Sequence, residues 1–276
     1  MTESTISNPV MRYLQEHPRW QAVGNKLKQL RTDIREAREL PHIEIYLMAD
    51  RAEARNHPFY ANLVKEHYRD ATRRHPKFPL IRHIEWGVAL CQLPATFDEY
   101  FMMVEGAARR NFKKAKRLGY EFRPFDFDDH LEEIQTIHRS TKVRQGPVSE
   151  ALMADLKPVG NPQPQDRTHG YPAFGAFNSD GVLRAYATCH IAGEMCMLED
   201  IYGDARYQSD GYVPMLYLSI GEHLLKEYPE VKYFAYGTYY GASETLRRFK
   251  RKFRFMPHRV TWKLNSPETS ANLAKG

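Results

Sequence analysis

The chain of 276 residues carries 40 Lys and Arg against 34 Asp and Glu, a formal net charge of +6, and 3 Cys. This length suits one large or two modest domains, three cysteines cannot form a disulfide framework, and no apolar run approaches the ~20 residues that cross a bilayer. The first ten residues lack a secretory pattern, so we expect a cytoplasmic protein without integral membrane association. The positive charge permits nucleic acid, acidic lipid or a phosphorylated cosubstrate and selects none of them.

Residues 1–95 predict an α/β region. Apolar side chains recur at helical spacing over 20–34. A strand is expected at 43–47, a helix begins at Pro58, and a second strand is expected at 84–93. No motif in this region carries chemistry.

Residues 96–119 predict one helix that carries the densest charge of the chain. Thr96 and Glu99 have the spacing of a capping box, and Gly119 supplies a stop. Six cations lie within nine residues of this helix: Arg109, Arg110, Lys113, Lys114, Lys116 and Arg117. Such a helix tracks a phosphate backbone or forms a solvated surface, and the sequence alone allows both.

The remaining segments complete the expected organisation. A strand at 120–125 and a helix at 128–140 follow the basic helix, and a long loop rich in Pro and Gly comes next. The last hundred residues predict strands at 173–177, 182–191, 195–202, 231–236 and 260–264, with helices at 211–228 and 243–253. The expected divisions are 1–95, 96–156, 157–172, 173–265 and a flexible tail at 266–276.

Gly211 opens the helix expected at 211–228. A glycine at a helix start lets backbone amides approach a phosphate, and the helix dipole favours an anion there. A turn glycine that opens a buried helix fits the sequence equally well. Asp210 counts against phosphate, because a carboxylate at the N-cap competes for the same amides.

The order of these last elements resembles the acyl-CoA-binding half of the GNAT acyltransferase superfamily. The pyrophosphate-binding loop of that family reads Q/R-x-x-G-x-G/A. Gln208 and Gly211 match its first two fixed positions, and Val213 stands where the pattern has Gly or Ala.

Two further segments resemble the FemAB-like branch of that superfamily. Residues 108–119 are similar to its basic helix. Residues 246–257 are similar to its closing L-x-x-F-K-x-K-F-G-F-x-P segment, with Arg254 in place of Gly. Because FemAB-like proteins often hold two GNAT-like halves, the resemblance leaves open a reduced first half within 1–95.

The resemblance implies an N-acyltransferase with an α/β or α+β fold, in which helices flank a mixed, mostly antiparallel sheet. It implies acyl-CoA as the donor, with acetyl-CoA as the default, a small-molecule or peptidyl amine as the acceptor, and no metal. Aminoacyl-tRNA is the alternative donor within this class. The alternative of another class is a non-catalytic protein that binds RNA or another anion through its basic helices.

The resemblance also places candidate site residues. Glu199 and Asp200 end the third strand of the C-terminal region and are candidate bases, or a solvated pair at a strand end. Tyr239 and Tyr240 follow the penultimate strand and are candidate acids, or ordinary packing residues. The expected donor contacts are Arg206, Gln208, Ser209, Gly211, Tyr212 and Val213. The expected acceptor contacts are Arg139, Lys142, Arg144 and Lys250.

Overall fold

A computed structural model describes Thr32, Arg35 and residues 39–76, 82–141, 150–160 and 165–273. Apart from Thr32, which is helical, the helix predicted over 20–34 lies outside the described residues. Contacts divide the chain into Met1–Pro41 and His42–Gly276. The fold and the site described below belong to the second unit.

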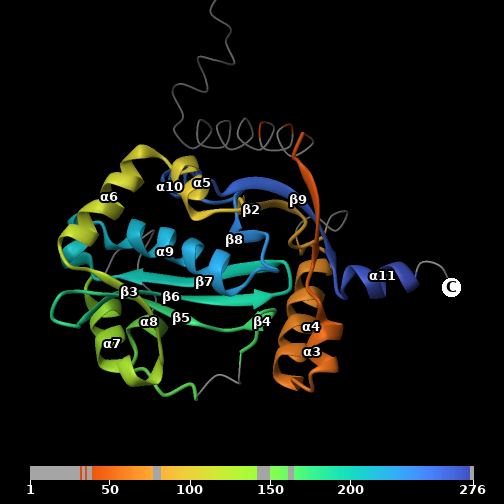
Figure 1. The fold of residues 1–276 in the computed structure, drawn as a ribbon, viewed down its shortest axis with the longest axis horizontal. Coiled ribbons are helices and arrows are strands. Elements are labelled where there is room, and N and C mark those ends of the chain that lie inside the picture. The colour runs from red at the N-terminus through yellow and green to blue at the C-terminus, as the bar shows by residue number, and fades with distance from the viewer. Residues whose placement is uncertain are drawn as a thin grey trace, which may run out of the picture. The chain divides into compact units, whose positions relative to one another are not determined.

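Nine strands of the described residues form one sheet, in the order β1-β9-β2-β8-β7-β6-β5-β3, with β4 beside β6. Their bounds are β1 His42–Tyr46, β2 Trp86–Gln92, β3 Glu121–Phe125, β4 His169–Gly170, β5 Ala173–Phe177, β6 Leu183–Ala192, β7 Met195–Gly203, β8 Tyr233–Thr238 and β9 Met256–Lys263. The β1–β9 and β7–β8 pairs are parallel and the other pairs are antiparallel. The expected mixed, mostly antiparallel sheet is confirmed (Figure 1).

The N-terminal strands belong to the same sheet as the C-terminal ones. β1 pairs with β9, and β2 lies between β9 and β8. The boundary predicted at residue 95 therefore does not separate two sheets. Similarly, the loop predicted at 157–172 contains β4, whose His169 pairs with Ala192 of β6.

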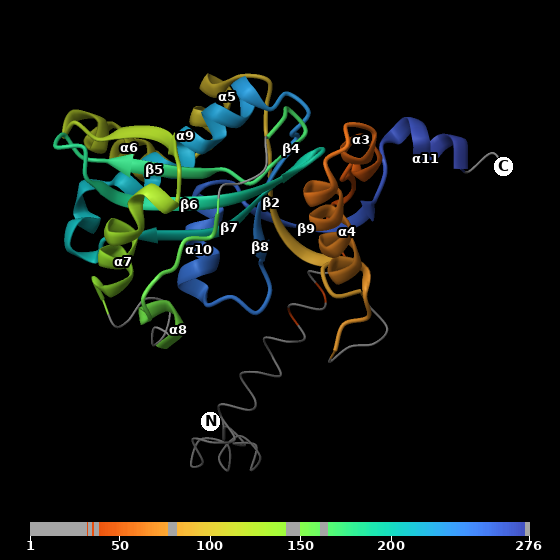
Figure 2. The ribbon, with the colours of Figure 1, turned by 90° about the horizontal axis from the view of Figure 1, so that it is seen from below.

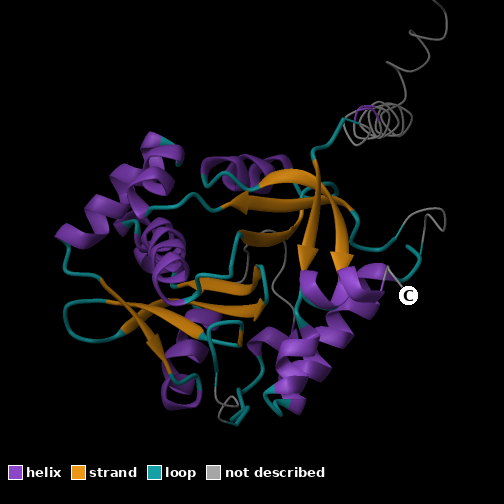
Figure 3. Cartoon of the chain, turned by 45° about the vertical axis from the view of Figure 1, so that its right-hand side comes forward, coloured by secondary structure: helices purple, strands orange, loops and turns teal. Residues whose placement is uncertain are grey.

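Helices flank the strands, as Figure 3 shows. Their bounds are α3 Ala49–Ala54, α4 Pro58–Thr72, α5 Phe97–Met103, α6 Gly106–Arg117, α7 Leu131–Arg139, α8 Glu150–Met153, α9 Tyr212–Glu227, α10 Glu244–Lys252 and α11 Pro267–Leu273. α5, α6 and α9 cover one face of β5–β7, while α7 and α8 lie on the other (Figure 2).

Side chains that alternate along β6 contribute to a hydrophobic cluster on each face of the sheet. Ala187 and Cys189 pack in the core beneath α9, whereas Tyr186 packs with Ile134 of α7 on the opposite face. Successive residues of a strand point to opposite faces, so one strand serves both layers. Tyr217 of α9 stacks on the Phe253 ring at 4.7 Å, which joins α9 to the end of α10.

The single helix predicted over 96–119 is wrong, because the structure has two helices there. The capping box of Thr96 and Glu99 is present and begins α5. Val104 and Glu105 then adopt ψ values of 144° and 140°, which are extended. The Glu105 amide donates to the Lys252 carbonyl at 2.9 Å. This bond coincides with the break between α5 and α6 and joins the start of α6 to the end of α10.

The flexible tail predicted at 266–276 is also corrected, since residues 267–273 form α11. Asp50 holds its start: the Ser266 amide donates to the carboxylate at 2.8 Å, and the Ser266 and Thr269 hydroxyls donate at 2.6 and 2.7 Å. Burial alone would raise the pKa of Asp50, but these hydrogen bonds lower it below the usual value. The carboxylate thus anchors the C-terminal segment on the start of α3.

Arg254 adopts a left-handed φ of +65° at the position where the FemAB-like segment has Gly. This conformation costs a non-glycine residue roughly 1–2 kcal/mol. We expect Arg254→Gly to raise the free energy of unfolding by up to about 1 kcal/mol, because the relieved strain exceeds the extra freedom of the unfolded chain. Urea unfolding measures this change.

Arg254→Ala is the matched control, since it removes the same side chain and keeps the strain. Equal stabilisation by Ala would assign the effect to the side chain. Loss of stability in the Gly variant would contradict the prediction.

Candidate active site

β7 and β8 are parallel neighbours that separate after three residues. Their pairs are Met195 with Tyr233, Cys196 with Phe234, and Met197 with Ala235. Both strands are fully described, and their pairing ends there although β7 continues to residue 203 and β8 to residue 238. β7 stays paired with β6 along its other edge. One edge of β7 therefore opens in the middle of the sheet, and we call this opening the β7–β8 gap.

A β-bulge lies immediately past the last β7–β8 pair. Cys189 of β6 faces Leu198, but Thr188 faces Asp200, so Glu199 is the extra residue of β7. A bulge interrupts the ladder and redirects the backbone. Amides turned out of a ladder in this way can donate to an oxyanion.

Glu199 and Asp200 stand at this bulge. Both side chains reach solvent, yet the protein around them raises the pKa of each above its usual value. Burial is the main cause for both, and the charge of Asp200 adds to the shift of Glu199. The two carboxylates contribute in turn to a pKa of about 12 for Tyr171, which burial raises most. A carboxylate with a raised pKa is a stronger base than a freely solvated one.

Lys250 projects from α10 onto the edge of β8 that borders the gap. Its side chain is 3% exposed, and Nζ donates to the carbonyls of Tyr236 and Thr238 at 2.6 and 2.7 Å. The Tyr239 amide donates to Gly87 of β2. Because a trans peptide holds C=O and N–H on opposite sides, the Thr238 carbonyl points away from β2 and toward the gap. Lys250 thus satisfies carbonyls that lost their strand partner.

The start of α9 is crowded on one side. Gly211 has φ +85°, and a Cβ there would lie 2.5 Å from the Asn111 carbonyl oxygen of α6. This contact explains the glycine as a packing requirement. Asp210 does not cap the helix. Its carboxylate accepts from the Tyr120 hydroxyl at 2.8 Å, and the N-cap of α9 has no side-chain hydrogen bond within the described residues.

Val213 lies against the end of β7. A Cβ on Gly203 would meet Cε2 of Tyr212 at 2.6 Å and Cγ2 of Val213 at 3.0 Å. The larger residue at the last position of the loop pattern is therefore accommodated by a glycine on the facing strand.

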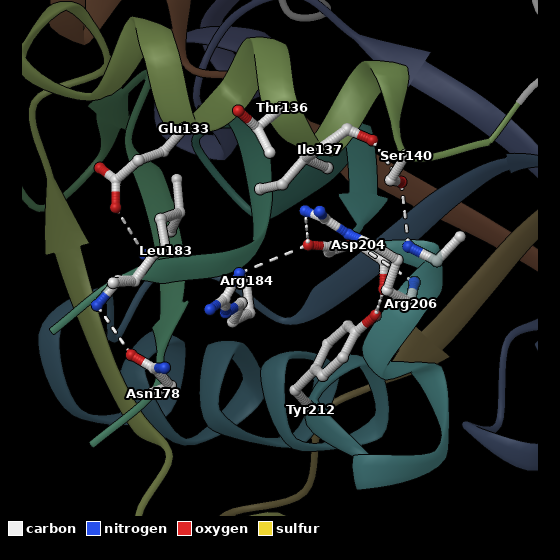
Figure 4. Close-up of polar contacts among 12 residues, drawn as sticks. Glu133, Thr136, Ile137, Ser140, Asn178, Leu183, Arg184, Asp204, Arg206 and Tyr212 are labelled. Atoms are coloured by element: carbon white, nitrogen blue, oxygen red, sulfur yellow. Dashed lines mark hydrogen bonds and ion pairs between the residues drawn. The ribbon is translucent and has the colours of Figure 1, made fainter. Parts of the chain in front are cut away.

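Asp204 organises the loop between β7 and α9 (Figure 4). Its side chain is 1% exposed. Arg206 donates to it through Nε at 2.9 Å and Nη2 at 2.7 Å, and the Ala205 amide donates to Ser140 Oγ at 2.9 Å. Burial would raise the pKa of Asp204, but the bonds from Arg206 lower it overall. The loop is thus fixed to the end of α7, and half of the Arg206 side chain stays exposed.

The other predicted site residues are spread over three places. The Tyr239 hydroxyl accepts from Arg251 at 2.7 Å, and the Tyr240 ring lies against Gly87 of β2. Arg139 pairs with Asp155 at 2.7 Å, and it lines a cavity of about 680 Å³ together with Arg206. Gln208 and Ser209 are exposed. Lys142 and Arg144 lie outside the described residues.

The basic helix α6 borders the loop that precedes α9. Lys114 donates to the Ser209 carbonyl at 2.6 Å, whereas no ion pair joins the six cations of α6 to an acid of the described residues. The bond from Glu105 to Lys252 joins the start of α6 to the end of α10, and each of these helices carries one of the basic clusters of the sequence.

The chain is similar to several solved structures over part of its length. One is the C-terminal domain of a putative lysylphosphatidylglycerol synthetase from Agrobacterium fabrum, with 15% identity, TM-score 0.42, and coverage of 63% of this chain and 57% of that one. Another is FemX, with 9% identity, TM-score 0.43, and coverage of 62% and 59%. A third is a GCN5-related N-acetyltransferase from Kribbella flavida, with 12% identity, TM-score 0.32, and coverage of 63% and 54%.

The structures that this chain resembles in part thus include GNAT and FemX proteins, and the chain spans less than two thirds of the length of each of the three. No family model matches the chain. No curated protein matches it either.

The described part of the chain contains no group of three or more His, Cys, Asp or Glu side chains placed to hold a metal ion. None of its helices combines the length and apolar character that crossing a membrane requires.

The sequence did not point to the bulge, to Thr188 or to Tyr171. Thr188 lies between the apolar residues Ala187 and Cys189 of its strand, so the sequence pattern places its side chain on the other face of the sheet. Its partner, however, depends on a register shift that has no local residue pattern.

Lys250 provides a prediction on pH dependence. Burial lowers its pKa from 10.5 to about 8. The folded protein therefore holds this proton less tightly than the unfolded chain, and stability rises with pH between these two values. Relative to Lys250→Met, we expect the wild type to gain about 2 kcal/mol of unfolding free energy between about pH 7.5 and about pH 9.5. Urea unfolding of both proteins at each pH tests this, and parallel pH profiles would contradict it.

Gly211→Ala tests the contact between α6 and α9. The left-handed φ alone costs about 1–3 kcal/mol. Gly181 also has a positive φ, of +77°, but a Cβ there meets nothing within 4 Å, so Gly181→Ala is the matched control. We expect Gly211→Ala to lower the unfolding free energy by clearly more than Gly181→Ala. Equal losses would show that the Asn111 carbonyl yields freely.

Proposed function

We propose that this chain is an N-acyltransferase that moves an acyl group from an acyl-CoA thioester to an amine. One observation carries the proposal: the β7–β8 gap opens at the bulge where Glu199 and Asp200 stand. A gap, a redirected backbone and two carboxylates of raised pKa thus meet at one point.

The gap suits an extended donor that carries amide groups. Beyond Met197, the edge of β7 toward β8 has no strand partner. An extended arm with N–H and C=O groups binds such an edge as an added strand. In this position the donor carbonyl lies beside the bulge, where a backbone amide stabilises the oxyanion of the tetrahedral intermediate.

Lys250 borders the same gap from β8. Its ammonium has three donors, and two of them serve Tyr236 and Thr238. We propose that the third donor contacts the acyl donor or the incoming acceptor. This gives a role to a buried cation that has no carboxylate partner among the described residues.

Side chains of this protein can accept or donate each proton that the transfer reaction moves. An ammonium acceptor gives one proton to Asp200 or Glu199, and the neutral nitrogen attacks the thioester carbon. The new C–N bond forms and the C–S bond breaks, the thiolate takes a proton from a tyrosine hydroxyl, and the second nitrogen proton restores that hydroxyl. We propose Tyr239 or Tyr240 as the donor to that thiolate.

The start of α9 is the proposed site for the phosphates of the donor. Because Asn111 fills the side of Gly211 that faces α6, the phosphates would approach from the exposed side of Gln208 and Ser209. The amides of Tyr212 and Val213 and the exposed part of Arg206 are the donors proposed there. Uncapped helix amides favour an anion.

Aminoacyl-tRNA is the alternative donor. The observation that favours it is the contact between the start of α6 and the end of α10, since each of these helices carries a basic cluster. Thermal shift separates the donors. A ligand at about 100 times its Kd stabilises the folded state by roughly 2.7 kcal/mol. We expect a shift with acetyl-CoA or CoA. If CoA thioesters give no thermal shift and the protein transfers an acyl group from aminoacyl-tRNA, then aminoacyl-tRNA is the donor and acyl-CoA is not. Salt-dependent RNA retention without any transfer would favour the non-catalytic alternative.

Asp200→Asn is the direct test of the base. Loss of a positioned general base lowers kcat by about 10²–10⁴-fold. We expect this loss with little change in the Kd of CoA, because the residue faces Thr188 and not the start of α9. Glu199→Gln is the matched comparison at the neighbouring position. Stopped-flow transfer assays across pH measure both. If neither variant loses more than a few-fold, the carboxylates are not the base.

A further inference from the structure

Asp200 also lines a cavity of about 850 Å³. Thr188 lies between Ala187 and Cys189, which pack beneath α9, so Thr188 and its partner Asp200 face the opposite side of the sheet. The cavity therefore lies on the face away from α9. We call it the acceptor cavity. Besides Thr188 and Asp200, its lining includes Phe59, Phe125, Asp126, Phe127, Val159 and Gly160.

The acceptor cavity contains two neighbouring side chains that can accept hydrogen bonds. Thr188 is 8% exposed, and Asp200 is its strand partner. Burial raises the pKa of Asp200, and a hydrogen bond with the Thr188 hydroxyl partly offsets this rise, so the two side chains lie within reach of each other. The carboxylate has two acceptor oxygens and the hydroxyl oxygen also accepts, so both residues can bind a ligand with N–H donors.

The charge of the cavity differs in sign from that of the chain. Its described lining contains Asp126 and Asp200 and no Lys, Arg or His, although the chain carries a net charge of +6. Such a lining attracts a cation and opposes a phosphate. This excludes a phosphorylated acceptor from the cavity.

The walls of the cavity are apolar and reach solvent at its mouth. Phe59 is 46% exposed and Val159 is 73% exposed, while Phe125 and Phe127 pack partly against the core of α7. Exposed apolar side chains grouped at one opening indicate a surface that an apolar partner covers. The volume lies within the range of small-molecule sites, about 300–1,000 Å³.

The mouth is held in place by Asp128. Its carboxylate accepts from the amides of Val159 and Gly160, both at 2.9 Å. The part of the mouth formed by Val159 and Gly160 is therefore fixed by hydrogen bonds from the backbone.

We infer that the acceptor cavity binds a primary amine carried on an apolar aromatic or alkyl body without phosphate, with its nitrogen at Thr188 and Asp200. This inference names the acceptor class of the proposed transferase and rests on that function for its catalytic meaning. The amine would meet the acyl donor at the bulge, because Asp200 belongs to both the cavity and the gap.

Calorimetry without any acyl donor tests the cavity by itself. The probes are phenethylamine, the matched phenethyl alcohol, and O-phosphoethanolamine. We expect phenethylamine to bind at least tenfold more tightly than the alcohol, because only the ammonium pairs with Asp200, and phosphoethanolamine not to bind. Equal affinity for amine and alcohol, preference for the phosphorylated amine, or no binding of phenethylamine would each overturn the inference.

Variants locate the binding. Phe59→Ser should weaken phenethylamine about tenfold, whereas Met102→Ser should not change it, because Met102 is exposed but lines a different surface. Thr188→Val should weaken the binding of the amine, since it removes a hydroxyl that faces the amine nitrogen. A structural role alone would lower the Tm and leave the affinity unchanged, and that result would overturn the placement.

The cavity and the function fail in different ways. Binding of phenethylamine without transfer from any donor would remove the proposed function and keep the cavity. Transfer to a phosphorylated amine, without binding of phenethylamine, would remove the cavity and keep the function.

Discussion

The separation of β7 from β8 is the constraint on which the rest of the structure depends. Two parallel strands that stop pairing inside a sheet leave backbone groups to be satisfied in another way. Lys250 takes the carbonyls of β8, and the bulge at Glu199 redirects the backbone of β7. A buried ammonium is unfavourable by itself, and here it is retained because it closes an edge that the fold opened.

The loop after β7 supports the gap from its far end. Asp204, buried beside Arg184 and Arg206, fixes the turn that reverses the chain into α9. Gly203 then admits Tyr212 and Val213 on one side, and Gly211 admits the Asn111 carbonyl on the other. The direction of α9 is thus set by two glycines and one ion-pair network, and the position of its first amides follows from that direction.

Local patterns predicted the elements, and long-range contacts decided what the sequence did not show. The strands at 182–191 and 195–202 match β6 and β7 to within about one residue, because alternation and a two-residue turn are local signals. The break at Glu105 depends on Lys252, far along the chain. Glu199 and Asp200 could be named from their place at a strand end, but the bulge is a property of the pairing with β6. The acceptor cavity combines α4, the segment after β3 and the floor of the sheet, so no single segment indicates it.

The acceptor cavity and the basic helix lie on opposite faces of one sheet, and their charges have opposite signs. The cations of α6 border the start of α9. The two carboxylates of the cavity, those of Asp126 and Asp200, lie on the opposite face of the sheet. An anionic donor and a cationic acceptor would then be drawn to different faces by the field of the protein. Paired strands lie only about 4.7–4.9 Å apart and leave no room for a substrate to pass between them. Reacting groups from the two faces can therefore meet only where the strands separate, at the β7–β8 gap. The fold would thereby keep two oppositely charged substrates from forming an unproductive pair before they react.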